Sequence, residues 1–152
     1  AQAAQGYEYF KEFGCATCHA GVNLGGESYE LMGLRRHYFE ERGLALTEED
    51  NGRFKQTQDE RDRHRFKVPG LRNIELTWPY YHDGTRLTMD DAVRDMALYQ
   101  CDAELSDADI ASIVAFLRTL TGEYQGKKLT SDNEYGVVLN AENHTHEEHE
   151  HE

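Results

Sequence analysis

The chain has 152 residues, of which 38% are hydrophobic and 30% charged, and its formal net charge is −13. This length suits one domain with an extension, and a core of so few apolar side chains would be thin unless a large apolar cofactor helped to fill it. The negative charge argues against nucleic acid as a partner and favours a partner protein with a basic surface. No apolar run approaches the roughly 18–20 residues needed to span a bilayer.

The N-terminal residues indicate an exported chain and a first helix. The opening AQAAQ resembles the mature end left after cleavage at a small-residue site, so we expect a periplasmic or otherwise exported protein. The stretch from Gln5 to Phe13 predicts a short helix that presents Phe10 and Phe13.

A C-x-x-C-H motif follows this helix, formed by Cys15, Cys18 and His19. A thioredoxin-like dithiol would need a βαβ context, and a structural zinc site would need a second pair of ligands, and neither is visible. The remaining interpretation is one covalently attached haem c, because two thiols can reach two vinyl groups on one porphyrin edge while the adjacent histidine ligates iron. The third cysteine, Cys101, is predicted to be a packed apolar residue.

Three irregular segments come next. Residues 21–33 are glycine-rich and loop-like. Residues 34–60 are charged, with a small capped turn from Thr47 to Asp50. Residues 65–87 contain both prolines and the only tryptophan, which predicts a structured loop.

Two helices are predicted after this loop. The first starts at a capping box, Thr88 to Asp91, and runs to about Gln100. The second is capped by Ser106 to Asp109. It carries an apolar stripe that we expect in the core, namely Ile110, Ile113, Val114, Leu117 and Leu120.

The C-terminal part differs from the rest. Periodicity is lost beyond Gly122, so we expect a mono-haem domain over residues 1–124 and a flexible extension over 125–152. Histidines alternate with carboxylates in its tail and could bind zinc, copper or nickel, although a solvating end is the preferred interpretation. They are His144, His146, His149 and His151.

The sixth iron ligand decides the function. Methionine or histidine there gives an electron carrier, whereas an open position permits peroxide or gas chemistry. Met89, Val93 and Met96 share one face of the first predicted helix. Spacing alone does not choose among the candidates, which are Met32, Met89, Met96, His37, His64 and His82.

Four stretches carry a family resemblance: GCATCHAGVNLGG, FKVPGLRNIELTWPYYHDG, LTMDDAVRDMALYQ and ELSDADIASIVAFLRTLTG. In this order the chain resembles the C-terminal haem domain of bacterial di-haem cytochrome c peroxidases. The resemblance implies a mostly α, class I cytochrome c-like domain with long loops, carrying a high-potential haem that receives electrons. It also implies that His19 is the proximal ligand and Met96 the distal ligand, with Met89 as the alternative.

The chain also departs from that family. The family's second haem domain, where peroxide is reduced, would need its own C-x-x-C-H, and this sequence holds one such motif. The family's calcium ion lies between the two domains, at positions that match Thr77 and Pro79. Calcium is therefore only a minor alternative here.

Other residues have two interpretations each. Arg72 could pair with a haem propionate or be a surface arginine. Trp78 could lie on an electron path, although packing at the haem edge explains it better. The resemblance implies a structural His82, and we expect solvated side chains at His37 and His64.

The sequence therefore predicts a soluble mono-haem c-type cytochrome that transfers single electrons through a His/Met-ligated haem. The alternatives are a small haem peroxidase, or the haem subunit of a larger redox complex.

Overall fold

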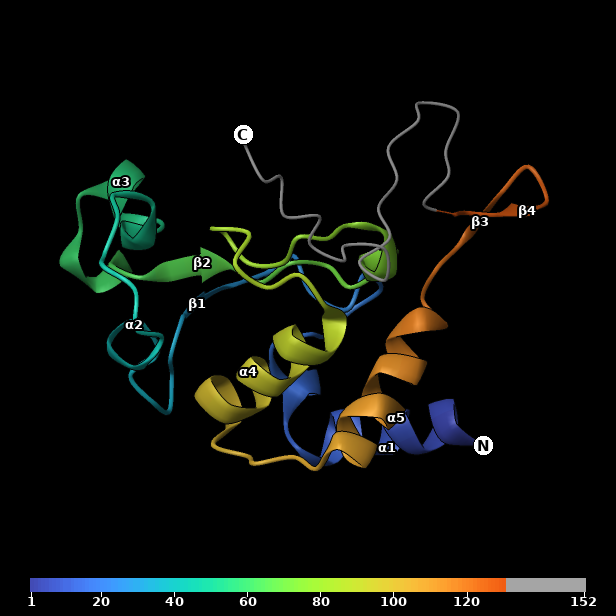
Figure 1. Cartoon of the computed structure of the whole chain (residues 1–152). Helices are drawn as coiled ribbons and strands as arrows, with labels where there is room; N and C mark the ends of the chain where they lie inside the picture. Colours follow the sequence, from blue (N-terminus) through green and yellow to red (C-terminus); the bar gives the residue numbers. More distant parts are fainter. Residues whose placement is uncertain (131–152) are drawn as a thin grey trace, which may run out of the picture.

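The computed structural model describes residues 1–130, which form a mostly helical domain with long loops, as predicted (Figure 1). The three longer helices are α1 (Gln2–Glu12), α4 (Met89–Cys101) and α5 (Asp107–Arg118), and two one-turn helices are α2 (Tyr38–Glu41) and α3 (Phe54–Thr57). Single 3-10 turns are η1 (Cys15–Thr17), η2 (Glu49–Asn51), η3 (Glu60–Asp62) and η4 (Ile74–Leu76). No helix within residues 1–130 is long and apolar enough to cross a membrane.

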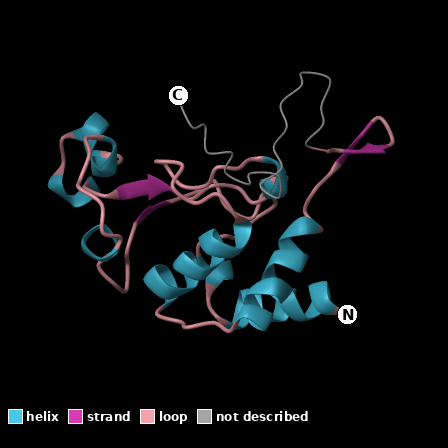
Figure 2. Ribbon diagram, viewed as in Figure 1, coloured by secondary structure: helices cyan, strands magenta, loops and turns pink. Residues whose placement is uncertain are grey.

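The strands are short and lie among the loops (Figure 2). β1 (Tyr29–Leu31) pairs antiparallel with β2 (Arg65–Lys67), and this pair closes the base of a peripheral lobe, residues 32–64, that contains α2 and α3. β3 (Glu123–Tyr124) pairs with β4 (Lys127–Lys128), so a hairpin spans the predicted domain boundary at residue 124. The histidine-rich tail lies outside the described residues.

Both predicted helix starts are confirmed by their caps. The Thr88 hydroxyl accepts from the Asp91 N–H at 3.1 Å at the start of α4. At α5, Ser106 and Asp109 form a complete capping box. The first helix begins at Gln2 rather than Gln5, because the alanines and glutamines of AQAAQ favour helix and extend it toward the N-terminus.

The main core forms where α1 crosses α5, beside α4 (Figure 1). Gly6 of α1 is buried at this crossing, and a β-carbon there would lie 1.8 Å from the backbone oxygen of Ser112. The absence of a side chain thus lets the two helices approach closely. The predicted stripe on α5 is confirmed as core: Ile110, Ile113, Val114 and Leu117 are buried, and Leu120 packs at the margin.

The close approach of α1 and α5 at Gly6 predicts that Gly6→Ala strongly destabilises the fold. The added methyl group collides with the α5 backbone, so we expect a loss of at least about 2 kcal/mol of unfolding free energy, although alanine is the better helix former. Urea unfolding of the haem-loaded chain measures this. Gln5→Ala, on an exposed position of the same helix, serves as the control and should change stability little. Equal stability of the two variants would show that the helices do not meet at Gly6.

Candidate functional site

The C-x-x-C-H motif lies in a tight turn directly after α1. Gly14 adopts a left-handed conformation, with φ of 88°, which glycine allows and which turns the chain from α1 into η1. The His19 N–H then donates to the Cys15 carbonyl at 3.0 Å. Both motif cysteines are half-buried, and the turn brings them and His19 to one wall of a cavity.

The His19 ring is held by the backbone. Its Nδ1 lies 3.1 Å from the Leu24 carbonyl oxygen, so Nδ1 carries the proton and Nε2 keeps a free lone pair. Burial lowers the pKa of His19, partly opposed by the carbonyls of Leu24 and Pro69. A neutral imidazole oriented by a carbonyl is the usual arrangement of a metal-bound histidine.

The cavity measures about 270 Å³ and has mostly apolar walls. The motif turn forms one part of the wall, and α4 contributes Met96, Gln100 and Cys101. Gln100 ties α4 to the strand region: its side-chain oxygen accepts from the Gly33 N–H at 2.7 Å and its amide donates to Leu31 at 2.9 Å. The remaining lining residues include Phe13, Glu30, Met32, Leu34, Arg35, Phe66, Lys67, Val68 and Pro69.

The three methionines occupy different places. Met32 and Met96 line the cavity that also contains His19, whereas Met89 is buried in the main core. Met89 and Met96 share one face of α4 but do not line the cavity together. Seven residues, about two helical turns, separate them, so Met89 lies in the core and Met96 lies at the cavity wall.

The histidine candidates other than His19 do not line the cavity. His37 is exposed, as expected. His64 is not simply solvated, because its Nδ1 lies 2.6 Å from the Asp50 carbonyl oxygen and its ring packs on Phe39 at 4.5 Å. His82 has a structural contact with the same aspartate, with 2.7 Å between Nε2 and Oδ1.

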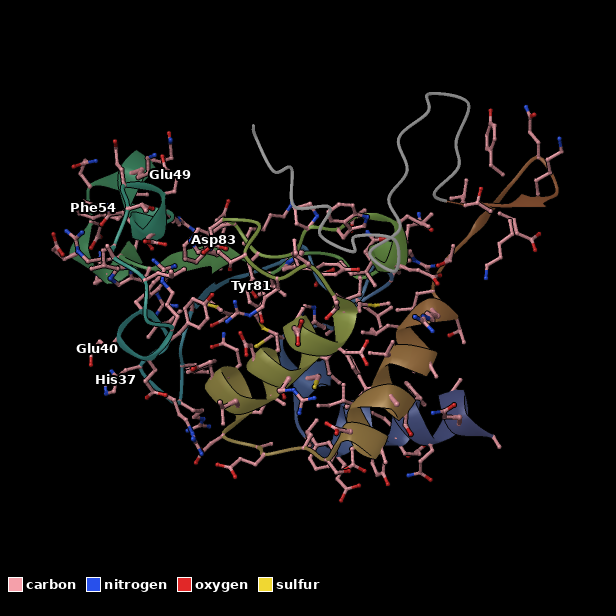
Figure 3. The ribbon with its side chains drawn as sticks, in the orientation of Figure 1. His37, Glu40, Glu49, Phe54, Tyr81 and Asp83 are labelled. Carbon is pink, nitrogen blue, oxygen red and sulfur yellow. The ribbon has the colours of Figure 1, made fainter. Side chains whose placement is uncertain are left out.

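Asp50 is the centre of this buried network. It is 1% exposed, it accepts two hydrogen bonds from the buried guanidinium of Arg42, and the Thr47 N–H adds a third at 2.6 Å, as the predicted turn requires. Arg42 also contacts Asp83 at 3.1 Å. Figure 3 shows Asp83 where the loop reaches the peripheral lobe, while Tyr81 lies over α4. The network therefore fastens this loop to the lobe.

Arg72 and Trp78 are not among the residues that line the cavity. The Arg72 Nε donates to the Val22 carbonyl at 2.8 Å, and its side chain lines a separate shallow hollow of about 360 Å³ together with Lys67. Trp78 packs against the main core. Lys67 lines both the hollow and the cavity, so Arg72 is a neighbour of the site. The roles of Arg72 and Trp78 toward a haem stay predictions.

The sequence predicted that Cys101 packs as an apolar residue, but not that it lines the cavity. It is half-buried and lines the cavity together with Cys15. Interaction with the Cys15 side chain lowers the pKa of Cys101 to about 7, and the same interaction, together with burial, raises the pKa of Cys15. The signal in the sequence was its position five residues after Met96, at the end of the helix that carries this implied distal ligand.

The donor set defines the class of site. The two motif thiols, the neutral imidazole of His19 and two thioethers, of Met32 and Met96, line one mostly apolar cavity, and these groups fit a covalently attached haem c. The sequence profile described as Cytochrome c matches residues 3–121. The chain belongs to the cytochrome c family and carries haem c.

Its relatives include bacterial peroxidases. The chain is 49% identical over 125 residues to "Cytochrome c peroxidase Ccp" of Escherichia coli (strain K12), covering 82% of this chain and 26% of that protein. It is 45% identical to "Cytochrome c551 peroxidase" of Nitrosomonas europaea, covering 82% and 36%. The chain thus spans about a quarter to a third of these relatives, and the predicted kinship with a haem domain of the cytochrome c peroxidase family is confirmed.

A solved structure supports the fold. It is the crystal structure of a MauG-like protein associated with microbial copper homeostasis, with a TM-score of 0.63 and 24% sequence identity. The likeness covers 78% of this chain and 43% of that one. The mostly α, cytochrome c-like fold predicted from the sequence is therefore confirmed.

The Asp50 network predicts a pH-dependent stability. Burial acts to raise the pKa of Asp50, but hydrogen bonds from Arg42, Thr47 and His82 outweigh it and leave the pKa below its ordinary value. A depressed carboxyl pKa stabilises the folded state above the ordinary value of about 4, and this contribution declines as the pH falls toward the folded pKa.

We therefore expect Asp50→Asn to lower the unfolding free energy by about 3–5 kcal/mol near neutral pH, because the buried Arg42 is then left with too little compensating negative charge. Urea unfolding at several pH values should show that the difference in unfolding free energy between Asp50→Asn and the parent becomes smaller as the pH falls. Asp59→Asn is the control, because its partner Arg61 is highly exposed and solvent screens that pair. A gap that stays constant with pH would contradict the assigned ionised state of Asp50.

Proposed function

We propose that this chain transfers single electrons as a mono-haem cytochrome c, with haem attached to Cys15 and Cys18 and iron ligated by His19 and Met96. When bound, the haem supplies the one-electron couple of its iron. The observation that supports this proposal best is that the motif turn and Met96 of α4 line the same cavity. A neutral thioether favours ferrous iron and a raised potential, which suits an electron carrier.

Met96 is preferred to Met32 as the sixth ligand. Met96 lies on α4, which is capped at Thr88 and tied through Gln100 to the strand region, so its backbone is well fixed. Met32 is buried inside a second cluster with Tyr38 and Tyr99, whereas Met96 packs at the edge of that cluster and is only half-buried. The family resemblance also favours Met96.

Replacement of Met96 tests the ligand assignment. The oxidised parent should show the far-red charge-transfer band of iron–sulfur ligation, and Met96→Ala should lose it and lower the reduction potential, because a neutral sulfur ligand is removed. Optical spectra and a redox titration measure both.

Met32→Leu and Met89→Leu are the matched controls, and both should keep the band. A band that survives in Met96→Ala but disappears in Met32→Leu would assign the sixth position to Met32. A high-spin parent without the band would indicate an open iron.

Peroxide reduction is the second candidate function. Both relatives described above carry the name peroxidase, and this observation favours it. Steady peroxide turnover by the purified chain with an artificial electron donor would support a peroxidase over a carrier. The chain spans 26% to 36% of these relatives, so a role as the haem part of a larger redox complex is a third candidate, which co-purification of a second polypeptide would support.

The proposed partner is a redox protein with a basic surface. We expect the two proteins to meet in the periplasm or in another compartment to which the chain is exported. The overall charge of −13 favours such an encounter. Near the cavity the charges are mixed, with Glu30, Arg35 and Lys67 among the lining residues. Seven of the acidic residues and none of the basic ones lie in residues 131–152, so more than half of the net charge belongs to that segment.

This distribution predicts how electron transfer responds to salt. The rate of reaction with a basic cytochrome used as a probe should fall as ionic strength rises, because salt screens the attraction. Deletion of residues 131–152 should lower the rate at low salt and make the rate less dependent on ionic strength. Stopped-flow absorbance measures both. A parent rate insensitive to ionic strength would contradict the steering.

A further inference from the structure

The loop of residues 80–86 contacts the middle of α4 at two points. The Tyr81 hydroxyl donates a hydrogen bond of 2.8 Å to the backbone carbonyl of Ala92, and Figure 3 shows Tyr81 over this helix. At the end of the loop, the Arg86 Nε lies 2.6 Å from a carboxylate oxygen of Asp95. The function proposed above gives neither Tyr81 nor Arg86 a role.

We propose that Tyr81 and Arg86 are positioning residues for the sixth iron ligand, because they hold the turn of α4 that carries Met96. This inference rests on the proposed function, in which the Met96 sulfur ligates iron. In an α-helix each carbonyl accepts from the N–H four residues later, so the Ala92 carbonyl is the backbone partner of Met96. The Tyr81 hydroxyl donates to the second lone pair of the same carbonyl oxygen.

The ion pair of Arg86 acts on the same turn of α4. Asp95 directly precedes Met96, and Ala92 lies on the same side of the helix, because residues three and four apart are neighbours on a helix surface. The side chains of Arg86 and Asp95 are 25% and 16% exposed, so solvent screens their contact less than it screens a surface pair. The pair therefore opposes a shift of the turn that carries Met96.

The loop is itself fastened elsewhere. The His82 Nε2 lies 2.7 Å from an oxygen of the buried Asp50 carboxylate, which belongs to the peripheral lobe. The Tyr80 N–H donates to the Arg86 carbonyl at 2.8 Å and closes the loop. A turn of α4 that is bonded to this loop cannot move without breaking contacts at both ends. The sulfur of Met96 is thus presented to the cavity from a fixed backbone.

Competition by imidazole in the haem-loaded chain tests the proposal. Imidazole reaches the sixth position only when the Met96 sulfur has left, so its apparent affinity reports the fraction of molecules with a displaced sulfur. Tyr81→Phe keeps the ring, which packs edge-on against Tyr38, and removes the hydroxyl. We expect this variant to bind imidazole roughly three- to tenfold more tightly, because one hydrogen bond that favours the ligated state is lost. Arg86→Gln should act in the same direction, and loss of the far-red band during the titration measures both.

Tyr80→Phe is the matched control for Tyr81→Phe. The Tyr80 hydroxyl donates to the Ile74 carbonyl at 3.2 Å, so this variant loses a bond of the same kind, but at η4 rather than at α4. Arg94→Gln is the control for Arg86→Gln, since Arg94 also lies on α4 and pairs with the exposed Asp107 at 2.8 Å. Both controls should bind imidazole like the parent, even where urea unfolding shows that a control and its test variant lose equal stability.

The outcomes separate this inference from the proposed function. If the parent shows the far-red band and a test variant binds imidazole no more tightly than its own control, the positioning role of that residue is overturned and Met96 remains the ligand. If the parent lacks the band, the ligand assignment and this inference fall together. Because Tyr81 and Arg86 are each compared with their own control, a failure of one variant to incorporate haem leaves the other to decide.

Discussion

The close crossing of α1 and α5 is the constraint on which the rest of the structure depends. Gly6 has no side chain, and the backbone of α5 at Ser112 occupies the space that a β-carbon would need. The motif turn begins three residues after α1 ends, so the crossing sets the position of Cys15. Because α5 also packs against α4, the same contact determines how α4 lies relative to the motif.

α4 serves two parts of the molecule at once. Its first turn carries Met89 into the main core, and its later turns present Met96 and Cys101 to the cavity. Gln100 joins the end of this helix to the turn after β1. The cavity is therefore bounded by elements that are each fastened elsewhere, which suits a site that must hold a large rigid ring with little rearrangement.

The sequence predicted the features that depend on local chemistry. The C-x-x-C-H motif, the caps at Thr88 and Ser106 and the stripe on α5 involve neighbouring residues, and the structure contains each of them. What it could not predict involves residues distant in the chain: the burial of Met89 in the core while Met96 lines the cavity, the contacts of His64, and the place of Cys101 in the cavity wall. These follow from tertiary packing, for which a single sequence carries no pairing signal.

The central claim is that one cavity holds a haem between the motif turn and α4. A crystal structure of the haem-loaded chain tests it most directly. The account predicts thioether bonds to Cys15 and Cys18, with Nε2 of His19 and the sulfur of Met96 as the two axial ligands. An iron that lacks the Met96 sulfur, through ligation by Met32 or through an open sixth position, would contradict the account.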